Sequence, residues 1–222
     1  MTSTQLPHYP TISPPHYLTA MEKISKWLSG VFSPILIPTY VFAGALWITP
    51  LAEASEHTRL ISALGVFLIT AMIPLATIIV LMRLGKVSDT AITDRRQRTV
   101  PFIVAILSYV GAALYIRGIH GPVWVTLFFL GAAAAATCAL AINTRWKISA
   151  HATSMAGMTV FYVWLTTHGL CLYGMLPWIT GCVLLCGAVG SARLVLDKHT
   201  PAQVYAGWGL GAACTAVFLS LL

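Results

Sequence analysis

Long apolar runs alternate with short polar segments along this chain of 222 residues. Each run is close to the roughly 20 residues that an α-helix needs to cross a bilayer. We place seven runs, of which the fifth and sixth are separated by only a few residues: 27–50, 60–82, 100–117, 121–143, 152–169, 172–190 and 203–222. The pattern predicts an all-α fold, a polytopic transmembrane bundle of six to seven spans.

The residues ahead of the first run form a different kind of segment. Residues 1–26 are rich in Pro, Thr, His and Tyr, without the basic start and short apolar core of a signal peptide. We expect them to form an interfacial tail that ends in a short amphipathic lead-in. Residues 27–222 then form a single transmembrane domain.

Prolines and small residues within the runs predict local features of the bundle. Pro34, Pro38 and Pro74 lie inside predicted spans and predict kinks, which neighbouring helices can compensate in a membrane. The run Gly131–Ala136 favours close helix packing because its side chains are small.

Composition supports the membrane assignment and limits the chemistry. The chain is 58% hydrophobic and 9% charged, whereas a soluble domain has about 25% charged residues. The six acidic residues all lie outside the apolar runs, and neither carboxylates nor His/Cys sets occur at metal-ligand spacing. We therefore expect no metal and no cofactor. The net charge of +7 favours an anionic substrate or membrane topology over a nucleic acid.

Alternation of the seven spans brings the polar segments to one membrane face. The N-terminus and the loops 83–99, 144–151 and 191–202 share a side. Of the 13 Lys and Arg residues, only Arg59 and Arg117 lie on the other. The positive-inside rule assigns the charged face to the cytoplasm, but charges that serve chemistry weaken this assignment. The side that the site faces stays open.

The loop between the last two spans carries the first candidate chemistry. Arg193 and His199 stand six positions apart, and Thr200, Pro201 and Gln203 have the pattern of a helix N-cap, N1 and capping box. His199 would then lie beside a helix N-terminus, which favours an anion. The alternative is a pair of interfacial residues that extend toward the head groups.

Two further polar islands lie on the same face. Ser149 and His151 offer a hydroxyl and an imidazole in a small-residue turn, or else Ser149 simply caps the fifth span. Asp94 can cap a helix with Gln97 at N3, which places Arg95 and Arg98 on one face as a clamp for a phosphoryl group. The alternative for this segment is a topogenic loop.

Together the islands indicate metal-independent phosphoryl chemistry. One histidine would attack phosphorus, the other would protonate the leaving oxygen, and arginines would hold the remaining phosphoryl oxygens.

These residues resemble the type 2 phosphatidic acid phosphatase (PAP2) superfamily, whose motifs are K-x6-R-P, P-S-G-H and S-R-x5-H-x3-D. Arg193 and His199 match the spacing of the third motif. Ser149-Ala-His151 is similar to the second, and the segment Arg95–Pro101 stands where the first belongs. The resemblance covers roughly residues 80 to 210.

The resemblance implies roles for these residues in a PAP2-like core. His199 would be the nucleophile and His151 the general acid. The phosphate would be held by a cationic and polar set: Arg193, Ser149, Arg98, Arg95 and Lys86. It also implies a lipid phosphate or polyprenyl diphosphate as substrate, membrane lipids as surroundings and a bacterial inner (cytoplasmic) membrane as location.

The chain departs from the family pattern at several positions. Ala192 and Ile148 replace the motif serine and proline, and Ala91 stands where the first-motif lysine belongs, so that Lys86 or Arg95 would have to substitute. Gln203 replaces the aspartate that orients the nucleophile. Glutamine at this place resembles the dolichyl diphosphatase branch and favours a polyprenyl diphosphate. We expect Gln203 either to orient His199 or to cap the last helix, and activity to be lower than with aspartate.

The sequence leaves two other functions open. A non-catalytic binder or transporter of lipid phosphates would use the basic face for recognition alone, and a lipid phosphotransferase would pass the phosphoryl group to an alcohol. The oligomeric state is not determined by the sequence.

Overall fold

The computed structural model of the protein describes residues 16–89, 92 and 94–222. The elements in chain order are α1 (His16–Val31), α2 (Ile37–Ile48), η1 (Pro50–Glu53), α3 (Glu56–Phe67), η2 (Leu68–Met72), α4 (Ile73–Arg83), η3 (Arg95–Arg98), α5 (Thr99–Gly118), α6 (Val123–Asn143), α7 (Ala150–Thr167), α8 (Leu176–Val195) and α9 (Pro201–Leu219). These residues form helices and no strand, which confirms the all-α prediction. Most of the predicted N-terminal tail, up to residue 15, and Ala91 lie outside the described residues.

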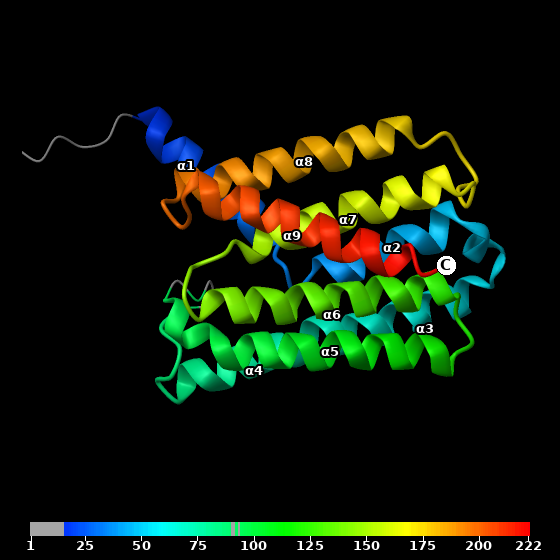
Figure 1. Cartoon of the computed structure of the whole chain (residues 1–222), viewed down its shortest axis with the longest axis horizontal. Helices are drawn as coiled ribbons and strands as arrows, with labels where there is room; N and C mark the ends of the chain where they lie inside the picture. The colour runs from blue at the N-terminus through cyan, green and yellow to red at the C-terminus, as the bar shows by residue number, and fades with distance from the viewer. Residues whose placement is uncertain (1–15, 90–91, 93) are drawn as a thin grey trace, which may run out of the picture.

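The long helices run side by side along the longest axis of the molecule (Figure 1). Five helical segments are long and apolar enough to cross a membrane: Glu56–Arg83, Arg95–Gly118, Val123–Asn143, Leu176–Val195 and Pro201–Leu219. They are compatible with an integral membrane protein, as the hydropathy pattern predicts.

The first predicted span, 27–50, is not one helix. The chain breaks between α1, which ends at Val31, and α2, which begins at Ile37. Pro34 lies in the break, and a proline disfavours helical geometry at the residue before it. The 12 residues of α2 reach only about 18 Å at 1.5 Å per residue, less than a bilayer core of about 30 Å. The sequence predicted a kink within one helix, because the apolar run continues on both sides of Pro34. The structure shows two separate helices instead.

Pro74 is accommodated differently. The segment Glu56–Arg83 stays helical throughout, but its middle turn, η2, is a π-helix in which the N–H of Ile73 donates to the carbonyl of Leu68. The wider turn directly precedes Pro74, whose ring would otherwise crowd the carbonyl four residues earlier. The proline therefore changes the helix type and does not end the helix.

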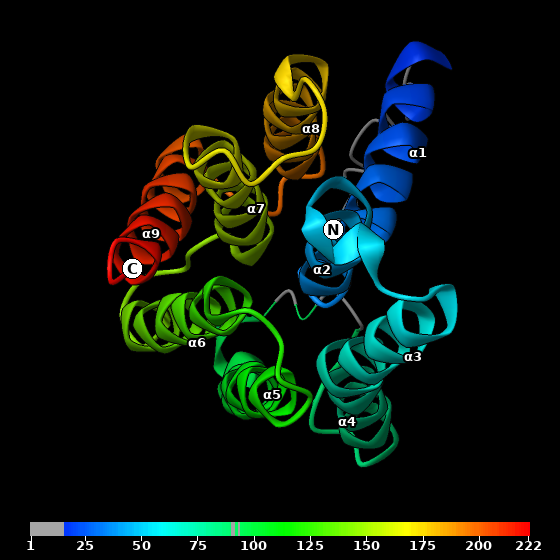
Figure 2. The same cartoon turned by 90° about the vertical axis from the view of Figure 1, so that its right-hand side faces the viewer.

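Glycines allow the closest contact in the bundle, between α7 and α9. A Cβ on Gly211 would collide with the main-chain oxygen of Thr153. A Cβ on Gly207 would lie 2.7 Å from the main-chain oxygen of Ser149. Gly131 of α6 lies close to α9 in the same way, because a Cβ on Gly131 would lie 3.3 Å from the carbonyl oxygen of Cys214. This confirms close packing at the small-residue run, and Figure 2 shows α6, α9 and α7 as neighbours.

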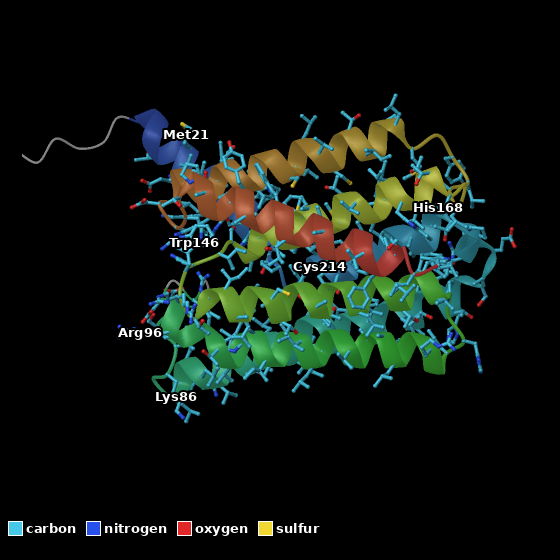
Figure 3. The ribbon with its side chains drawn as sticks, in the orientation of Figure 1. Met21, Lys86, Arg96, Trp146, His168 and Cys214 are labelled. Carbon is cyan, nitrogen blue, oxygen red and sulfur yellow. The ribbon has the colours of Figure 1, made fainter. Side chains whose placement is uncertain are left out.

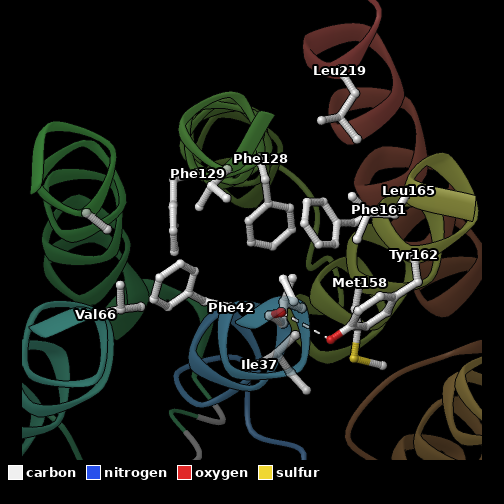
Figure 4. Packing of buried hydrophobic residues seen from close by; sticks show 14 of the residues in the cluster. Ile37, Phe42, Val66, Phe128, Phe129, Met158, Phe161, Tyr162, Leu165 and Leu219 are labelled. Carbon is white, nitrogen blue, oxygen red and sulfur yellow. Dashed lines mark hydrogen bonds between the residues drawn. The ribbon is translucent and has the colours of Figure 1, made fainter. Parts of the chain in front are cut away.

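Aromatic side chains fill the half of the bundle where α6 begins. Phe42 of α2, Phe128 and Phe129 of α6, and Phe161 and Tyr162 of α7 pack together as buried side chains (Figure 4). Ring centroids of Phe128 and Phe161 lie 4.7 Å apart. These rings fill the space between α2, α6 and α7 in this half of the bundle.

Candidate functional site

The three polar islands meet at one end of the bundle. Lys86, Arg96 and Trp146 lie at this end in Figure 3, and His168 lies at the opposite end. Hydrogen bonds join the islands directly: a guanidinium N–H of Arg98 donates to the carbonyl of Ile148 at 3.2 Å. The convergence that the alternating spans predicted is therefore confirmed for the described residues.

The island of Arg193 to Gln203 is also hydrogen-bonded to the island of Ser149 and His151. The main-chain N–H of Ser149 donates to the carbonyl of Gln203 at 3.3 Å. The loops 83–99 and 144–151 and the start of α9 are therefore joined in one hydrogen-bonded framework.

A cavity of about 530 Å³ opens beside this framework. Its polar part includes six basic or imidazole side chains: Lys26, Arg98, His151, Arg193, Lys198 and His199. It continues between the helices as a chamber with mainly apolar walls, among them Ile37, Ile78, Phe102, Tyr109, Phe128 and Ala136. The cavity therefore has a cationic head and an apolar tail.

His199 is held in one tautomer by Gln203. Oε1 of Gln203 accepts the main-chain N–H of Thr200 at 3.3 Å, and a main-chain N–H can only donate, so the amide orientation is fixed. The same oxygen lies 3.0 Å from Nδ1 of His199. Nδ1 must therefore carry the proton, which leaves the lone pair of Nε2 free.

The sequence treated orientation of His199 and capping of the last helix as alternatives for Gln203. The structure shows both. Thr200 and Gln203 form a complete capping box at the start of α9, and the glutamine oxygen that closes it also accepts from His199. A carboxamide oxygen has two lone pairs, so one atom can serve both donors.

The polar end of the cavity disfavours further positive charge. Burial, and then the guanidinium groups of Arg98 and Arg193, lower the pKa of His199 to about 3. Burial and the same two arginines also lower the pKa of Lys147, which stands beside them. His199 is therefore a neutral imidazole at physiological pH, as a nucleophile requires.

Arg193 is the most unusual group of the site. It lies in the last turn of α8 with only 3% of its surface exposed, and within the described part of the chain its Nε has no hydrogen-bond partner. The one ion pair among the described residues joins Lys26 to Glu22. Asp89 is near enough to favour the charge on Arg193 but forms no ion pair with it. A buried guanidinium without a directly bound anion is costly, so the cavity favours an anion at this point.

Arg98 is also buried but is firmly anchored. Its Nε donates to the carbonyl of Ile92 at 2.8 Å, in addition to the bond to Ile148. These contacts fix the guanidinium at the cavity wall and leave other N–H groups of its fork for a ligand.

His151 reaches the cavity from the first turn of α7. Its Nε2 lies 3.0 Å from the carbonyl oxygen of Ser29 in α1. The residue stands near Arg193, Arg98 and His199, so two imidazoles and two guanidinium groups surround the same space.

Three of the predicted phosphate-binding residues do not line the cavity. Ser149 is fully buried and caps α7, because its hydroxyl accepts the N–H of Ala152 at 3.3 Å. Arg95 binds the carbonyl of Thr144 at 2.7 Å and caps the end of α6. Lys86 is an exposed side chain. The structure therefore supports the capping alternative for Ser149, and it gives Arg95 a helix-capping contact that the sequence did not indicate.

The predicted clamp of Arg95 and Arg98 is consequently not formed, and neither is the predicted capping box. Asp94 does cap η3 by accepting the N–H of Arg96. Gln97, however, accepts the N–H of Ser88 at 2.9 Å instead of reaching back to Asp94. The short 3-10 turn directs consecutive side chains differently from the α-helix that the sequence indicated.

Ser29 and Tyr109 face the cavity and were not identified from the sequence. Tyr109 is buried, and its hydroxyl donates to the carbonyl of Pro34 at 3.4 Å. Neither belongs to a polar island. The only local signal was Pro34, which marks the helix end beside Ser29.

A comparison with known protein families, curated proteins and solved structures found no match to this chain. Among the described residues, no group of three or more His, Cys, Asp or Glu side chains is arranged to hold a metal ion.

Proposed function

We propose that this protein is a membrane lipid phosphatase of the PAP2 type, acting on a lipid phosphate or polyprenyl diphosphate through a phosphohistidine. The observation that carries the proposal is the buried Arg193, whose unpartnered Nε lies at the cationic head of a cavity with an apolar tail. A phosphate group complements the head and an acyl or prenyl chain complements the tail.

The arrangement of the two histidines supports a covalent mechanism. The free lone pair of Nε2 of His199 forms a bond to phosphorus as the bond from phosphorus to the lipid oxygen breaks. His151 relays the acidic proton of the bound phosphate group to that oxygen, and Arg98 and Arg193 stabilise the charge on the remaining phosphoryl oxygens. Water then attacks the phosphohistidine, and one of its protons passes through His151 to the phosphate, which releases inorganic phosphate and restores both neutral imidazoles.

The finer architecture belongs to the same proposal. α2 and α7 would complete a PAP2-like core with the five long apolar segments, and the cationic end would lie at the level of the lipid head groups. The apolar walls of the chamber, such as Phe102 and Ala136, would then face the hydrocarbon part of the substrate.

Phosphate release from purified protein in detergent tests the proposal directly. We expect release from lipid phosphates and polyprenyl diphosphates in EDTA without added Mg²⁺, and its loss in His199→Ala. Full release by His199→Ala would contradict the mechanism. Head-group binding without release would instead support a binder or transporter, and transfer to an added alcohol in preference to water would support a phosphotransferase.

A further inference from the structure

The C-terminal end of α1 contacts the site although α1 lies outside all three polar islands. Ser25 and Ser29 are buried on its inner side, whereas Met21, Ile24 and Trp27 are about half exposed or more on its outer side. This is the reverse of a helix on a soluble protein. It suits a helix whose outer side meets lipid and whose inner side meets a polar cavity.

Ser29 differs from several other hydroxyl residues of the described helices in what its side chain contacts. Ser62, Thr70 and Thr166 each donate to the carbonyl four residues earlier, at 2.7 to 2.9 Å. The hydroxyl of Ser29, by contrast, has no partner among the described residues, although it is buried and lines the cavity. Ser29 is thus directed at the site and away from its own helix.

The carbonyl of Ser29 is available because α1 ends two residues later. Pro34 disfavours helical geometry at Ser33, the residue whose N–H would otherwise bind this carbonyl. The carbonyl oxygen lies 3.0 Å from Nε2 of His151, 122 residues away in sequence. Since a carbonyl only accepts, Nε2 must carry a proton in this contact, and Nδ1 holds the lone pair.

The charges around His151 show why this contact matters. Burial opposes a second proton on the imidazole most strongly, and Arg193 of α8, His199 and Arg98 at the start of α5 oppose it further. The first turn of α7, which carries His151, also presents the positive end of a helix dipole. The Ser29 carbonyl, at the negative end of α1, favours the protonated form.

We propose that Ser29 is a positioning residue, whose main-chain carbonyl holds Nε2–H of His151 and so makes Nδ1 the nitrogen that exchanges a proton with the bound phosphate ester. This rests on the proposed function for the identity of the ester. The tautomer itself does not depend on turnover. In the reaction, Nδ1 accepts the acidic proton of the bound monoprotonated phosphate ester and passes it to the leaving oxygen. A proton of the attacking water then passes through Nδ1 to the released phosphate, so that Nδ1 ends with its lone pair free.

Nitrogen NMR of the full-length protein, labelled at its histidines and assigned with His151→Asn, tests the tautomer. We expect Nδ1 of His151 to give an unprotonated signal at neutral pH and Nε2 a protonated one. A His151 that carries its proton on Nδ1 would overturn the proposal, whether or not the protein hydrolyses lipids. Because this spectrum needs only the wild-type protein, it decides even if a variant fails to fold.

Pro34→Ala tests how the helix end contributes. Without the proline, α1 can continue past Val31 and supply a helical donor to the Ser29 carbonyl. We expect a mixture of His151 tautomers and a fall in kcat of about tenfold or more with KM little changed. Unchanged spectra and kcat would contradict the proposal.

Two matched variants separate the carbonyl from other effects. Pro38→Ala removes a proline from the first turn of α2 and leaves the end of α1 as it is. Ser29→Ala removes the hydroxyl but keeps the carbonyl. Both should retain the wild-type His151 tautomer, and a Ser29→Ala spectrum that matches Pro34→Ala would show that the side chain is responsible and would overturn the carbonyl role.

Discussion

Oε1 of Gln203 lies 3.0 Å from Nδ1 of His199, and the same oxygen closes the capping box of α9. The helix start and the orientation of the imidazole therefore depend on one atom. A glutamine fixes the tautomer of His199 as an aspartate would, but it adds no negative charge to stabilise the imidazole when phosphorus is bound.

Replacing Gln203 separates these contributions. Gln203→Glu keeps the reach of the side chain and adds a charge, so we expect kcat to rise. Gln203→Met removes the acceptor, so we expect a fall of about 10²-fold. Gln203→Asp, with a shorter side chain, should also raise turnover if the missing charge is the limiting factor, and an unchanged or abolished rate would contradict this. Phosphate release measures all three.

Thr200→Ala is the matched control for helix capping. It removes the hydroxyl that accepts the N–H of Gln203 and leaves Oε1 of Gln203 in place. We expect a loss of about 1 kcal/mol in stability with little change in kcat. A kcat as low as that of Gln203→Met would show that capping, and not imidazole orientation, limits the reaction.

Arg193→Met tests the buried anion site by thermal unfolding in detergent. The wild-type protein should gain Tm on addition of inorganic phosphate, because an anion that binds only the folded state stabilises it. The variant removes a buried charge that lacks a partner for its Nε, so we expect its Tm without phosphate to be equal or higher. It should show no gain with phosphate, and a gain equal to that of the wild type would exclude Arg193 from the anion site.

The pH dependence of stability reports on His199. An unfolded histidine takes up its proton near pH 6.5, whereas burial lowers the pKa of His199 to about 3 in the folded protein. Between these pH values the unfolded chain binds more protons, so the free energy of unfolding falls as the pH drops. His199→Asn should therefore lose less Tm than the wild type between about pH 7 and about pH 5.

His57→Asn, which removes an exposed histidine at the start of α3, controls for the loss of one titratable group. It should follow the wild-type curve. If the Tm of His199→Asn also followed the wild-type dependence on pH, the conclusion that His199 is a buried neutral imidazole would be wrong.

Gly211 should be intolerant of any side chain. A Cβ there meets the main-chain oxygen of Thr153, and a backbone atom of α7 cannot move aside without separating the two helices. We expect Gly211→Ala to cost about 3 kcal/mol. Gly209, on the same helix, has open space around a Cβ, so Gly209→Ala should be neutral or stabilising by about 0.5 to 1 kcal/mol. Equal Tm values for the two variants would contradict the close contact.

The apolar chamber can be tested without touching the polar residues. Ala136 of α6 is buried in its wall, so Ala136→Phe should reduce release from lipid phosphates at least about tenfold by excluding the chain. Release from a small water-soluble phosphate ester should change little. Thr137→Phe, at an exposed neighbouring position, is the control, and equal losses on both substrates in Ala136→Phe would contradict a tail-binding chamber.

The sequence by itself determined the helices and the convergence of the polar islands. Apolar runs and caps are local, since each depends on residues within a few positions, and alternation of spans then brings 83–99, 144–151 and 191–202 to one end. The motif spacing also identified Arg193 and His199. Local pattern failed at Pro34, where the runs on both sides are apolar but the helix is broken.

Only the tertiary structure decided which side chains face the cavity. Arg95 and Arg98 are both basic and three positions apart, yet one caps α6 and the other lines the site. In the same way, Ser149 caps α7 whereas His151 lines the cavity. The partner of His151 is a carbonyl of Ser29 in a distant helix. A side chain's direction depends on what packs against its element, and those neighbours come from parts of the chain that no local pattern connects.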